Sequence, residues 1–76
     1  MSFEIRIPGL GAGMNEGKLV AWHVADGATV REGDLLYTLE SEKTAQDVDA
    51  PGSGTLKIIG VEEEIYPVGE LIGTIG

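Results

Sequence analysis

The chain has no cysteine and only one histidine, His23, among its 76 residues. Disulfides, thiolate metal sites and multi-histidine metal sites are therefore excluded, and the lack of cysteine suits a reducing compartment. The apolar runs span only a few residues, so no segment is long enough to cross a bilayer as a helix. The first residues lack a basic cluster followed by an apolar run, so we expect no signal peptide. These absences predict a soluble protein.

Basic residues are scarce as well. Five Lys and Arg face 13 Asp and Glu, which gives a net charge of −8 and a pI near 4.3. Phosphate backbones and anionic membrane surfaces would be repelled, so we expect neither a nucleic-acid nor a membrane partner. The charge favours partners with basic surfaces. No acid–base pair, nucleophile triad or metal-ligand cluster stands out, and we predict no catalytic residue and no metal site.

Short apolar runs separated by glycine-containing turns dominate the chain, and no segment shows a sustained helical period. This pattern predicts an all-β sandwich or barrel that forms one domain over residues 1–76. A short extended piece is also expected at Thr29. The expected strands cover residues 3–7, 18–24, 35–39, 46–48, 55–61 and 71–75.

Gly9, Gly11 and Gly13 precede the second expected strand. A glycine-rich phosphate loop needs a helix N-terminus behind it, and the residues that follow are β formers instead. We therefore favour a surface loop whose Leu10 and Met14 pack into the core over a phosphate site.

The two halves of the chain resemble each other. Residues 33–39 match residues 69–75 at a shift of 36, and residues 17–22 match residues 54–59 at a shift of 37. We place the one-residue difference in the turns around Asp26 and Glu63, the latter within the acidic run 62–64, which is interpreted as a solvated turn. Neither half can bury its apolar face alone, so the repeat predicts two halves that share one core around a pseudo-two-fold axis.

The same alignment predicts which side chains of the second strand point inward. Val20 aligns with Lys57, which predicts that Val20 points outward, whereas the pairs Trp22/Ile59 and Val24/Val61 are expected to be buried. The alternation therefore slips by one residue near Ala21. A β-bulge would cause such a slip.

The expected strands at 35–39 and 46–48 flank a short polar segment, which predicts a hairpin with Glu42-Lys43 at its tip. Two interpretations of Lys43 stay open on local grounds: an ordinary turn lysine paired with acidic neighbours, or an amine held out for attachment of a chemical group. The repeat places the counterpart of this turn where the chain begins and ends. Lys43 is therefore expected at the end of the domain opposite both termini.

Motifs over nearly the whole chain, taken in order, are similar to those of the lipoyl domains of 2-oxo acid dehydrogenase acyltransferases, a family that also includes biotin carrier domains. The fold that this resemblance implies is a flattened β-barrel of two four-stranded antiparallel sheets. The matching residues are Pro8-x-Leu10, Met14-x-Glu16-Gly17-x-Leu19-Val20-x-Trp22, Asp26-Gly27-Ala28-x-Val30, Gly33-Asp34-x-Leu36, Glu40-Ser41-Glu42-Lys43-Thr44, Ala50-Pro51, Gly54 and Pro67-Val68-Gly69.

The resemblance implies that Lys43 carries lipoate in amide linkage. The usual tripeptide of the family is Asp-Lys-Ala, and here it is Glu42-Lys43-Thr44, which changes the place that a modifying enzyme reads. Biotin domains usually have methionine on both sides of the lysine, so these neighbours favour lipoate, with biotin as the alternative. Glu40, Glu42, Thr44 and Ala45 are the implied contacts for modifying and partner enzymes. A third possibility is a β interaction domain with an unmodified lysine.

The resemblance also implies partners. These are a thiamine-dependent decarboxylase, an acyltransferase core and a dihydrolipoyl dehydrogenase of a 2-oxo acid or acetoin dehydrogenase complex, with a lipoate ligase or octanoyl transferase as the modifying enzyme. The expected compartment is the bacterial cytoplasm or the mitochondrial matrix. The carboxylates of Glu40, Glu42, Asp47 and Asp49 would dock basic partner surfaces; a solvated acidic face is the alternative. His23 is expected to be a solvent-facing strand residue.

Overall fold

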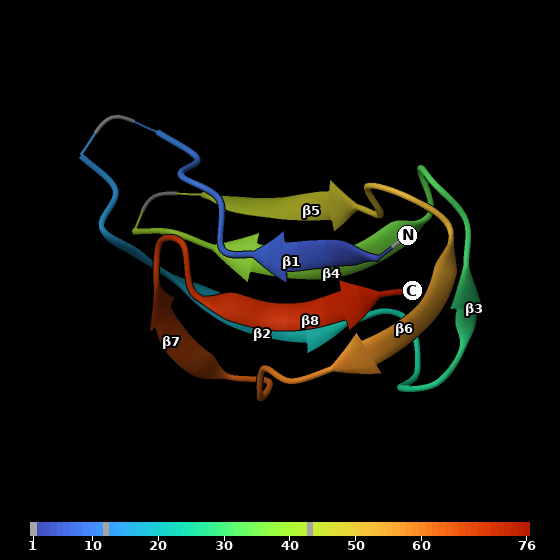
Figure 1. The fold of residues 1–76 in the computed structure, drawn as a ribbon. Helices are drawn as coiled ribbons and strands as arrows, with labels where there is room; N and C mark the ends of the chain where they lie inside the picture. The colour runs from blue at the N-terminus through green and yellow to red at the C-terminus, as the bar shows by residue number, and fades with distance from the viewer. Residues whose placement is uncertain (1, 12, 43) are drawn as a thin grey trace.

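The computed structural model describes residues 2–11, 13–42 and 44–76, which form eight β-strands (Figure 1). Within these residues no helix is present that is long and apolar enough to cross a membrane. The strands are β1 (Phe3–Arg6), β2 (Glu16–Trp22), β3 (Thr29–Val30), β4 (Leu35–Glu40), β5 (Ala45–Asp49), β6 (Gly54–Ile58), β7 (Glu64–Pro67) and β8 (Leu71–Ile75).

The strands build two four-stranded antiparallel sheets that face each other. One sheet has the order β1-β8-β6-β3 and the other has the order β5-β4-β2-β7. The molecule measures 32 × 20 × 18 Å along its principal axes, and the two layers are visible in Figure 1. The predicted all-β class, the two four-stranded sheets and the antiparallel pairing are confirmed.

The core lies between the sheets, where alternate side chains of each strand point inward. Among the described residues, eleven buried apolar side chains fill it, and Leu19, Leu36, Leu39, Ile72 and Ile75 have no measurable exposure. Leu10 and Met14 pack against this core from the loop between β1 and β2, as predicted. The buried residues are Ile5, Ile7, Leu19, Val30, Leu36, Tyr37, Leu39, Ala50, Leu56, Ile72 and Ile75.

The strand order shows the predicted pseudo-two-fold symmetry. Replacing β1, β2, β3 and β4 by β5, β6, β7 and β8, and the reverse, converts the order of one sheet into that of the other. Hydrogen bonds repeat as well: the Gly27 N–H donates to the Leu56 carbonyl at 2.7 Å, and the Glu63 N–H donates to the Leu19 carbonyl at 2.7 Å. The two halves therefore exchange equivalent contacts across one shared core.

Two irregularities in the strands form a matched pair. In the pairing of β4 with β5, Leu36 is skipped between Leu35 and Tyr37. In the pairing of β1 with β8, Ile72 is skipped, because Ile5 pairs with Gly73 and the next residue, Arg6, pairs with Leu71. The skipped residues, Leu36 and Ile72, are both fully buried. They occupy equivalent places in the repeat, so each sheet bends at the same position.

The bulge expected near Ala21 is confirmed, because the register of β2 against β4 skips Val20. This bulge corrects our placement of the one-residue difference in the repeat. Before the bulge, Leu19 pairs with Leu39 as Leu56 pairs with Ile75, so β2 and β6 correspond at a shift of 37. After the bulge, Trp22 pairs with Tyr37 as Ile58 pairs with Gly73, so the same two strands correspond at a shift of 36. The extra residue therefore lies in the bulge rather than in the turns around Asp26 and Glu63.

The burial predicted for Ile59 and Val61 is wrong, since these side chains are 49% and 60% exposed. The shift of 36 beyond the bulge makes Ile59 the counterpart of the exposed His23. Strand β6 ends at Ile58 rather than at Val61 because the chain then crosses toward β7. Gly60 lies close to the core at this crossing, and its carbonyl accepts a hydrogen bond from Trp22 Nε1 at 3.1 Å.

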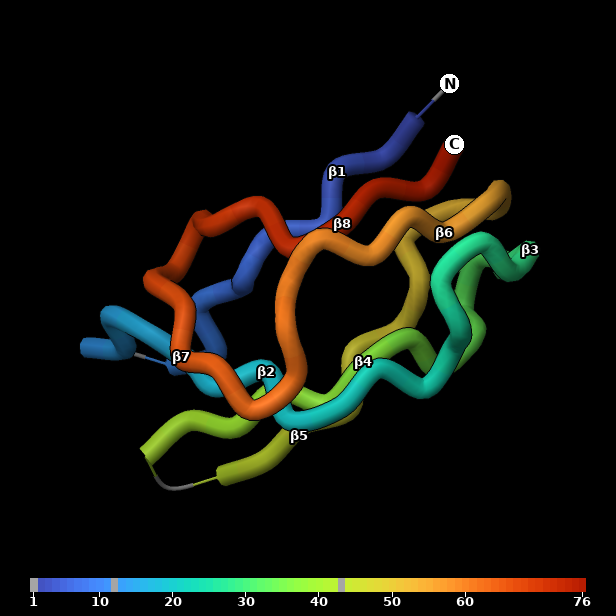
Figure 2. The backbone as a smooth tube through the Cα atoms, turned by 90° about the horizontal axis from the view of Figure 1, so that it is seen from below, coloured from blue at the N-terminus to red at the C-terminus, as the bar shows by residue number. Residues whose placement is uncertain are grey.

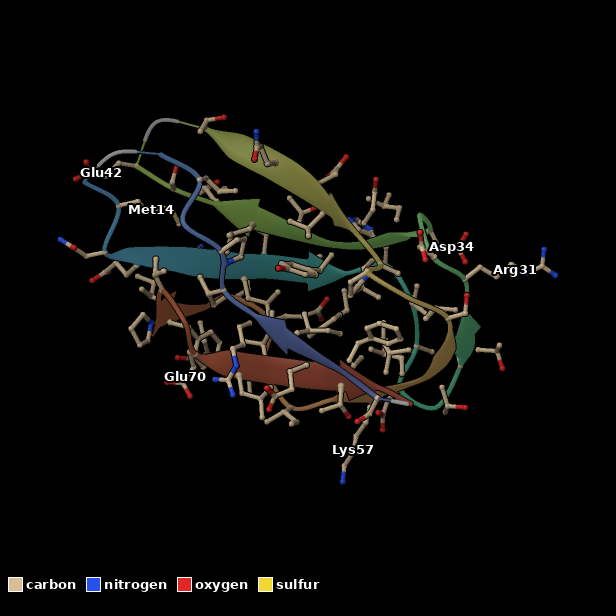
Figure 3. All side chains as sticks on the ribbon, turned by 45° about the horizontal axis from the view of Figure 1, so that its top comes forward. Met14, Arg31, Asp34, Glu42, Lys57 and Glu70 are labelled. Carbon is tan, nitrogen blue, oxygen red and sulfur yellow. The ribbon has the colours of Figure 1, made fainter. Side chains whose placement is uncertain are left out.

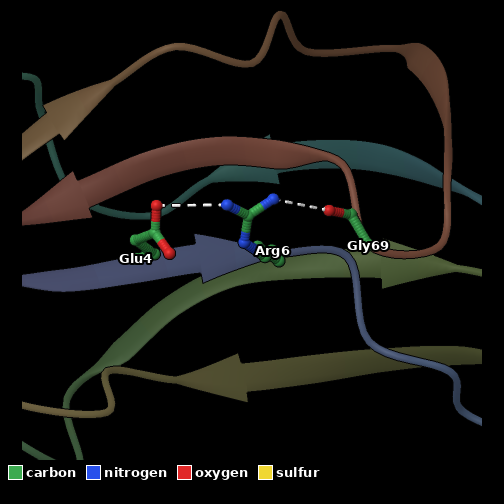
Figure 4. Close-up of polar contacts among 3 residues, drawn as sticks. All are labelled: Glu4, Arg6 and Gly69. Atoms are coloured by element: carbon green, nitrogen blue, oxygen red, sulfur yellow. Dashed lines mark hydrogen bonds and ion pairs between the residues drawn. The ribbon is translucent and has the colours of Figure 1, made fainter.

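The end of β1 is joined to the turn between β7 and β8 (Figure 4). Arg6 donates from Nη1 to the carbonyl of Gly69 at 2.9 Å and from Nη2 to Glu4 Oε2 at 3.1 Å. Gly69 has a φ of 93°, which glycine adopts without the steric cost of a Cβ. The contacts fix the point from which the chain leaves β1 toward the loop that precedes β2.

Candidate functional site

The β4–β5 hairpin is confirmed, and its turn is tight. Glu40, the last residue of β4, pairs with Ala45, the first residue of β5. The Ser41 N–H donates to the Thr44 carbonyl at 2.8 Å, and Ser41 Oγ donates to the same oxygen at 3.2 Å. Only two residues lie between Ser41 and Thr44, so this bonding fixes the base of the turn.

This turn lies at the end of the molecule opposite both chain ends. Figure 1 shows the two ends of the chain together toward one end of the molecule. The end of β4 and the start of β5, which the turn connects, lie at the other end. Figure 2, turned by 90°, shows the same separation. Lys43 itself is outside the described residues, so its predicted position is represented here only by its neighbours Glu42 and Thr44, which are both exposed.

The four implied contact residues come together around this turn. Glu40, Glu42, Thr44 and Ala45 are all exposed, so each is accessible to another protein. Whether they contact a partner stays a prediction.

Lys18, on the neighbouring strand β2, is engaged within the domain. Its Nζ lies 2.9 Å from Glu63 Oε2. The hydrogen bond and the charge of Glu63, with a further contribution from the charge of Glu40, raise the pKa of Lys18 above its usual value. Lys18 is thus held as a cation that contacts a carboxylate of its own domain.

A groove of about 590 Å³ separates this turn from the loop between β1 and β2. Figure 3 shows Met14 of that loop and Glu42 of the turn at the same end of the molecule, away from Arg31 and Asp34. Sequence reasoning missed this groove, because no local pattern indicates that two loops far apart in sequence will lie side by side. Its lining comprises Leu10, Gly11, Gly13, Met14, Asn15, Glu16, Ser41, Glu42 and Thr44.

A smaller hollow of about 210 Å³ lies on the β2–β7 side of the same turn. It shares Glu16, Ser41 and Glu42 with the groove but adds the charged side chains of Lys18 and Glu40. The turn therefore has a larger hollow that includes Leu10 and Met14 on one side, and a smaller one that includes Lys18, Glu40 and Ile65 on the other.

The outer face of β4 and β5 carries a short polar chain. His23 Nε2 lies 2.6 Å from Thr38 Oγ1, and Thr38 Oγ1 donates to Asp47 Oδ1 at 2.8 Å. His23 is exposed, as predicted, but it lies just beyond the end of β2. Asp47 and Asp49 are exposed along β5, so they remain accessible acidic groups on the sheet that holds the turn.

The glycine loop and the acidic run 62–64 both have local roles in the described structure. The glycine loop leads into strand β2 rather than into the helix N-terminus that would favour a phosphate. In the acidic run, the Glu62 carboxylate accepts the Trp22 N–H at 2.8 Å and Glu63 pairs with Lys18. Among the described residues, no group of three or more His, Cys, Asp or Glu side chains is placed to hold a metal ion.

A rigid β-barrel that holds a tight, exposed turn away from both chain ends has the architecture of a carrier domain. Comparison with known proteins agrees with this class. Residues 3–75 match the biotin/lipoyl family model, which is described as "Biotin-requiring enzyme". The chain belongs to the biotin/lipoyl family.

Relatives of the chain include acetyltransferase components of pyruvate dehydrogenase complexes. It is 38% identical over 73 residues to the dihydrolipoyllysine-residue acetyltransferase component of the pyruvate dehydrogenase complex of Staphylococcus aureus, covering 95% of this chain. The corresponding protein of Staphylococcus epidermidis is 36% identical over the same length. The chain spans only 17% of the length of these relatives.

A solved structure shows the same fold. The lipoyl domain of the 2-oxoglutarate dehydrogenase complex from Azotobacter vinelandii superposes with a TM-score of 0.80 at 26% identity, covering 96% of this chain and 94% of that domain. The fold is therefore that of a lipoyl domain, a domain type without a catalytic site of its own.

Proposed function

We propose that this chain carries lipoate in amide linkage on Lys43 and serves as the mobile-arm domain of a dihydrolipoyl acyltransferase in a 2-oxo acid dehydrogenase complex. The observation that carries this proposal is the tight turn closed by Ser41 and Thr44 at the end opposite the chain ends. Relatives named as dihydrolipoyllysine-residue acetyltransferases support lipoate as the group.

The residues around the turn fit such a group. Glu42 and Thr44 are exposed on either side of Lys43 in the sequence, so no buried side chain of these neighbours would have to move for attachment. The Ser41–Thr44 bonds would hold the base of the arm rigid. Amide formation would remove one positive charge and take the formal net charge from −8 to −9.

Lipoate, when bound, supplies a redox-active disulfide that can carry acyl groups and electrons. The domain's own contribution is placement, because a rigid turn on a tethered barrel raises the effective concentration of its cargo at each partner. The proposed partners are a thiamine-dependent decarboxylase, the acyltransferase core and a dihydrolipoyl dehydrogenase. The exposed carboxylates of Glu40, Glu42, Asp47 and Asp49 would favour basic surfaces on these partners.

Intact mass spectrometry tests the attachment. The domain is produced with lipoate and a lipoate ligase, and the mass should rise by one lipoyl group. Lys43→Arg should abolish the rise, because arginine keeps the charge but cannot be acylated by the ligase. Lys18→Arg and Lys57→Arg are the matched controls and should retain it. A rise that persists in Lys43→Arg would move the site to another lysine.

Incubation with biotin and a biotin ligase, followed by streptavidin binding, tests the alternative cargo. We expect no binding, because the neighbours of Lys43 are Glu42 and Thr44 rather than methionines. Streptavidin capture without lipoylation would assign the chain to the biotin branch. A folded domain that neither ligase modifies would favour an unmodified interaction domain.

A further inference from the structure

We propose that the groove between the β1–β2 loop and the β4–β5 turn is a resting site for the lipoyl arm, which docks there between visits to partner enzymes. This inference rests on the proposed attachment of lipoate to Lys43. It adds a binding site within the domain itself, with Leu10 and Met14 on the loop side, Ser41 and Thr44 on the turn side, and the carboxylates of Glu16 and Glu42 at its border.

The first argument is position. Glu42 and Thr44, the residues before and after Lys43, both line the groove. A group attached between them therefore starts at the groove's edge and needs no long reach to enter it. The other end of the groove is formed by Leu10 and Met14, which lie more than 25 residues earlier in the chain.

The second argument is chemistry. Leu10 and Met14 are half-buried, so they present apolar surface that remains partly open. Methionine is polarisable and adapts to irregular ligands. The lipoyl arm is a neutral hydrocarbon chain that ends in a disulfide ring, so it would gain from burial against these two side chains. The groove offers no described lysine or arginine, which argues against an anionic ligand.

The third argument is the contrast with the hollow on the other side of the turn. That hollow has about 210 Å³, whereas the groove has about 590 Å³, and Glu16 and Glu42 line both. Small-molecule sites usually measure about 300–1,000 Å³. Size thus directs the arm to the groove.

Described residues on both sides of the groove are hydrogen-bonded within the domain. On the loop side, the Leu10 N–H donates to Met14 Sδ at 3.1 Å, and the Val68 N–H donates to the Asn15 carbonyl at 3.0 Å. On the turn side, Ser41 and Thr44 are bonded to each other. A preorganised site avoids the entropic cost of ordering its own loops.

The tether makes weak affinity sufficient. A short flexible link gives an effective concentration in the millimolar range. A groove that binds the free arm with a Kd of about 1 mM would therefore be occupied roughly half of the time. Occupancy of this order would shield the disulfide and still leave it free to reach a partner.

Nuclear magnetic resonance on the lipoylated domain, with lipoylation first verified by intact mass, tests the proposal. We expect nuclear Overhauser effects between the protons of the dithiolane ring and the Met14 methyl group. We also expect reduction of the arm's disulfide by a small thiol to be about twofold slower than in Met14→Gln, because half occupancy halves the accessible fraction. Ile59→Gln replaces an apolar side chain that is 49% exposed and lies outside the groove lining, and this variant should behave as the wild type.

A verified lipoyl domain that shows no contact between the ring and Met14 would overturn the docking proposal and leave the attachment intact. Equal reduction rates in the wild type and Met14→Gln would overturn it as well. A domain that gains no lipoyl mass would overturn both the attachment and the docking. The Overhauser measurement on the wild type decides the matter even if Met14→Gln proves unstable.

Discussion

The two halves of the molecule share a frame but fill it differently. Trp22 and Tyr37 of the first half pack with ring centroids 5.3 Å apart, and their counterparts in the second half are Ile58 and Gly73. A Cβ on Gly73 would lie 3.2 Å from Trp22 Cη2. Gly73 of the second half has no side chain, and the indole ring of Trp22 from the first half packs against it.

The connections differ in the same way. Leu39 of β4 pairs with Gln46 of β5, and its counterpart Ile75 of β8 pairs with Phe3 of β1. The chain runs from Leu39 to Gln46 through the turn that contains Lys43. No such turn connects Ile75 to Phe3, because these residues lie near the two ends of the chain. The comparison teaches that the repeat determines strand order, whereas the departures from symmetry create both the aromatic part of the core and the site.

Removing equivalent core side chains gives the largest expected effect. Leu39→Ala and Ile75→Ala each delete a fully buried side chain, and each should cost about 2–5 kcal/mol. Urea denaturation should show a large loss for both variants, because both side chains are fully buried in the shared core. Leu35→Ala, at a residue 42% exposed, should cost less than either. A cost for Ile75→Ala as small as that for Leu35→Ala would contradict a shared core.

Alkaline pH should lower the stability of the domain through Tyr37 of the first half. Its counterpart in the second half, Gly73, has no ionisable group. Burial raises the pKa of Tyr37 to about 12 from the usual 10.0. The unfolded chain therefore loses this proton first, so stability is kept below pH 10 and lost as the pH rises from about 10 to 12, by about 2–3 kcal/mol in total. Urea midpoints measured along this pH series should fall.

Tyr37→Phe keeps the ring but lacks the ionisable hydroxyl, so its midpoints should fall less over the same pH range. The raised pKa of Lys18 acts in the same direction above pH 10.5 in both proteins, so their difference isolates Tyr37. Equal losses in wild type and Tyr37→Phe would show that the tyrosine is not responsible.

Gly73→Ala tests the space reserved for Trp22. The new Cβ would lie 2.9 Å from the backbone oxygen of Lys57, which cannot move away easily, and should cost about 1–3 kcal/mol as overpacking does. Tryptophan fluorescence should report the displaced ring. Gly11→Ala, where a Cβ meets nothing within 4 Å, is the control. Wild-type stability and fluorescence in Gly73→Ala would mean that the indole ring is not packed against this position.

The smallest expected effects concern the equivalent turn residues Gly27 and Glu63, which have φ values of 85° and 72°. Gly27→Ala should cost about 1–2 kcal/mol, because an alanine is strained at this positive φ. The space around the new Cβ is open, so no steric clash adds to this cost. Glu63→Gly removes the same strain together with a salt bridge to Lys18 between exposed side chains, which is worth about 0–1 kcal/mol. Its thermal midpoint should stay level or rise, and a marked fall would show that the salt bridge outweighs the strain.

Period-two alternation and glycine punctuation were sufficient to predict the all-β class and most strands, because both signals are local. The repeat predicted the shared core and, through the slip near Ala21, the bulge at Val20. The burial of Ile59 and Val61 could not be predicted correctly, since the position of the extra residue depends on which residues pair across strands.

The sequence by itself determined the identity of the candidate attachment residue, Lys43, and its place in a short turn between two strands. Only the tertiary structure decided what surrounds that turn. The loop around Met14 is brought beside it by sheet pairing and core packing between segments distant in sequence. Such long-range contacts leave no periodic signature in the chain, because they depend on shape and volume summed over the whole core.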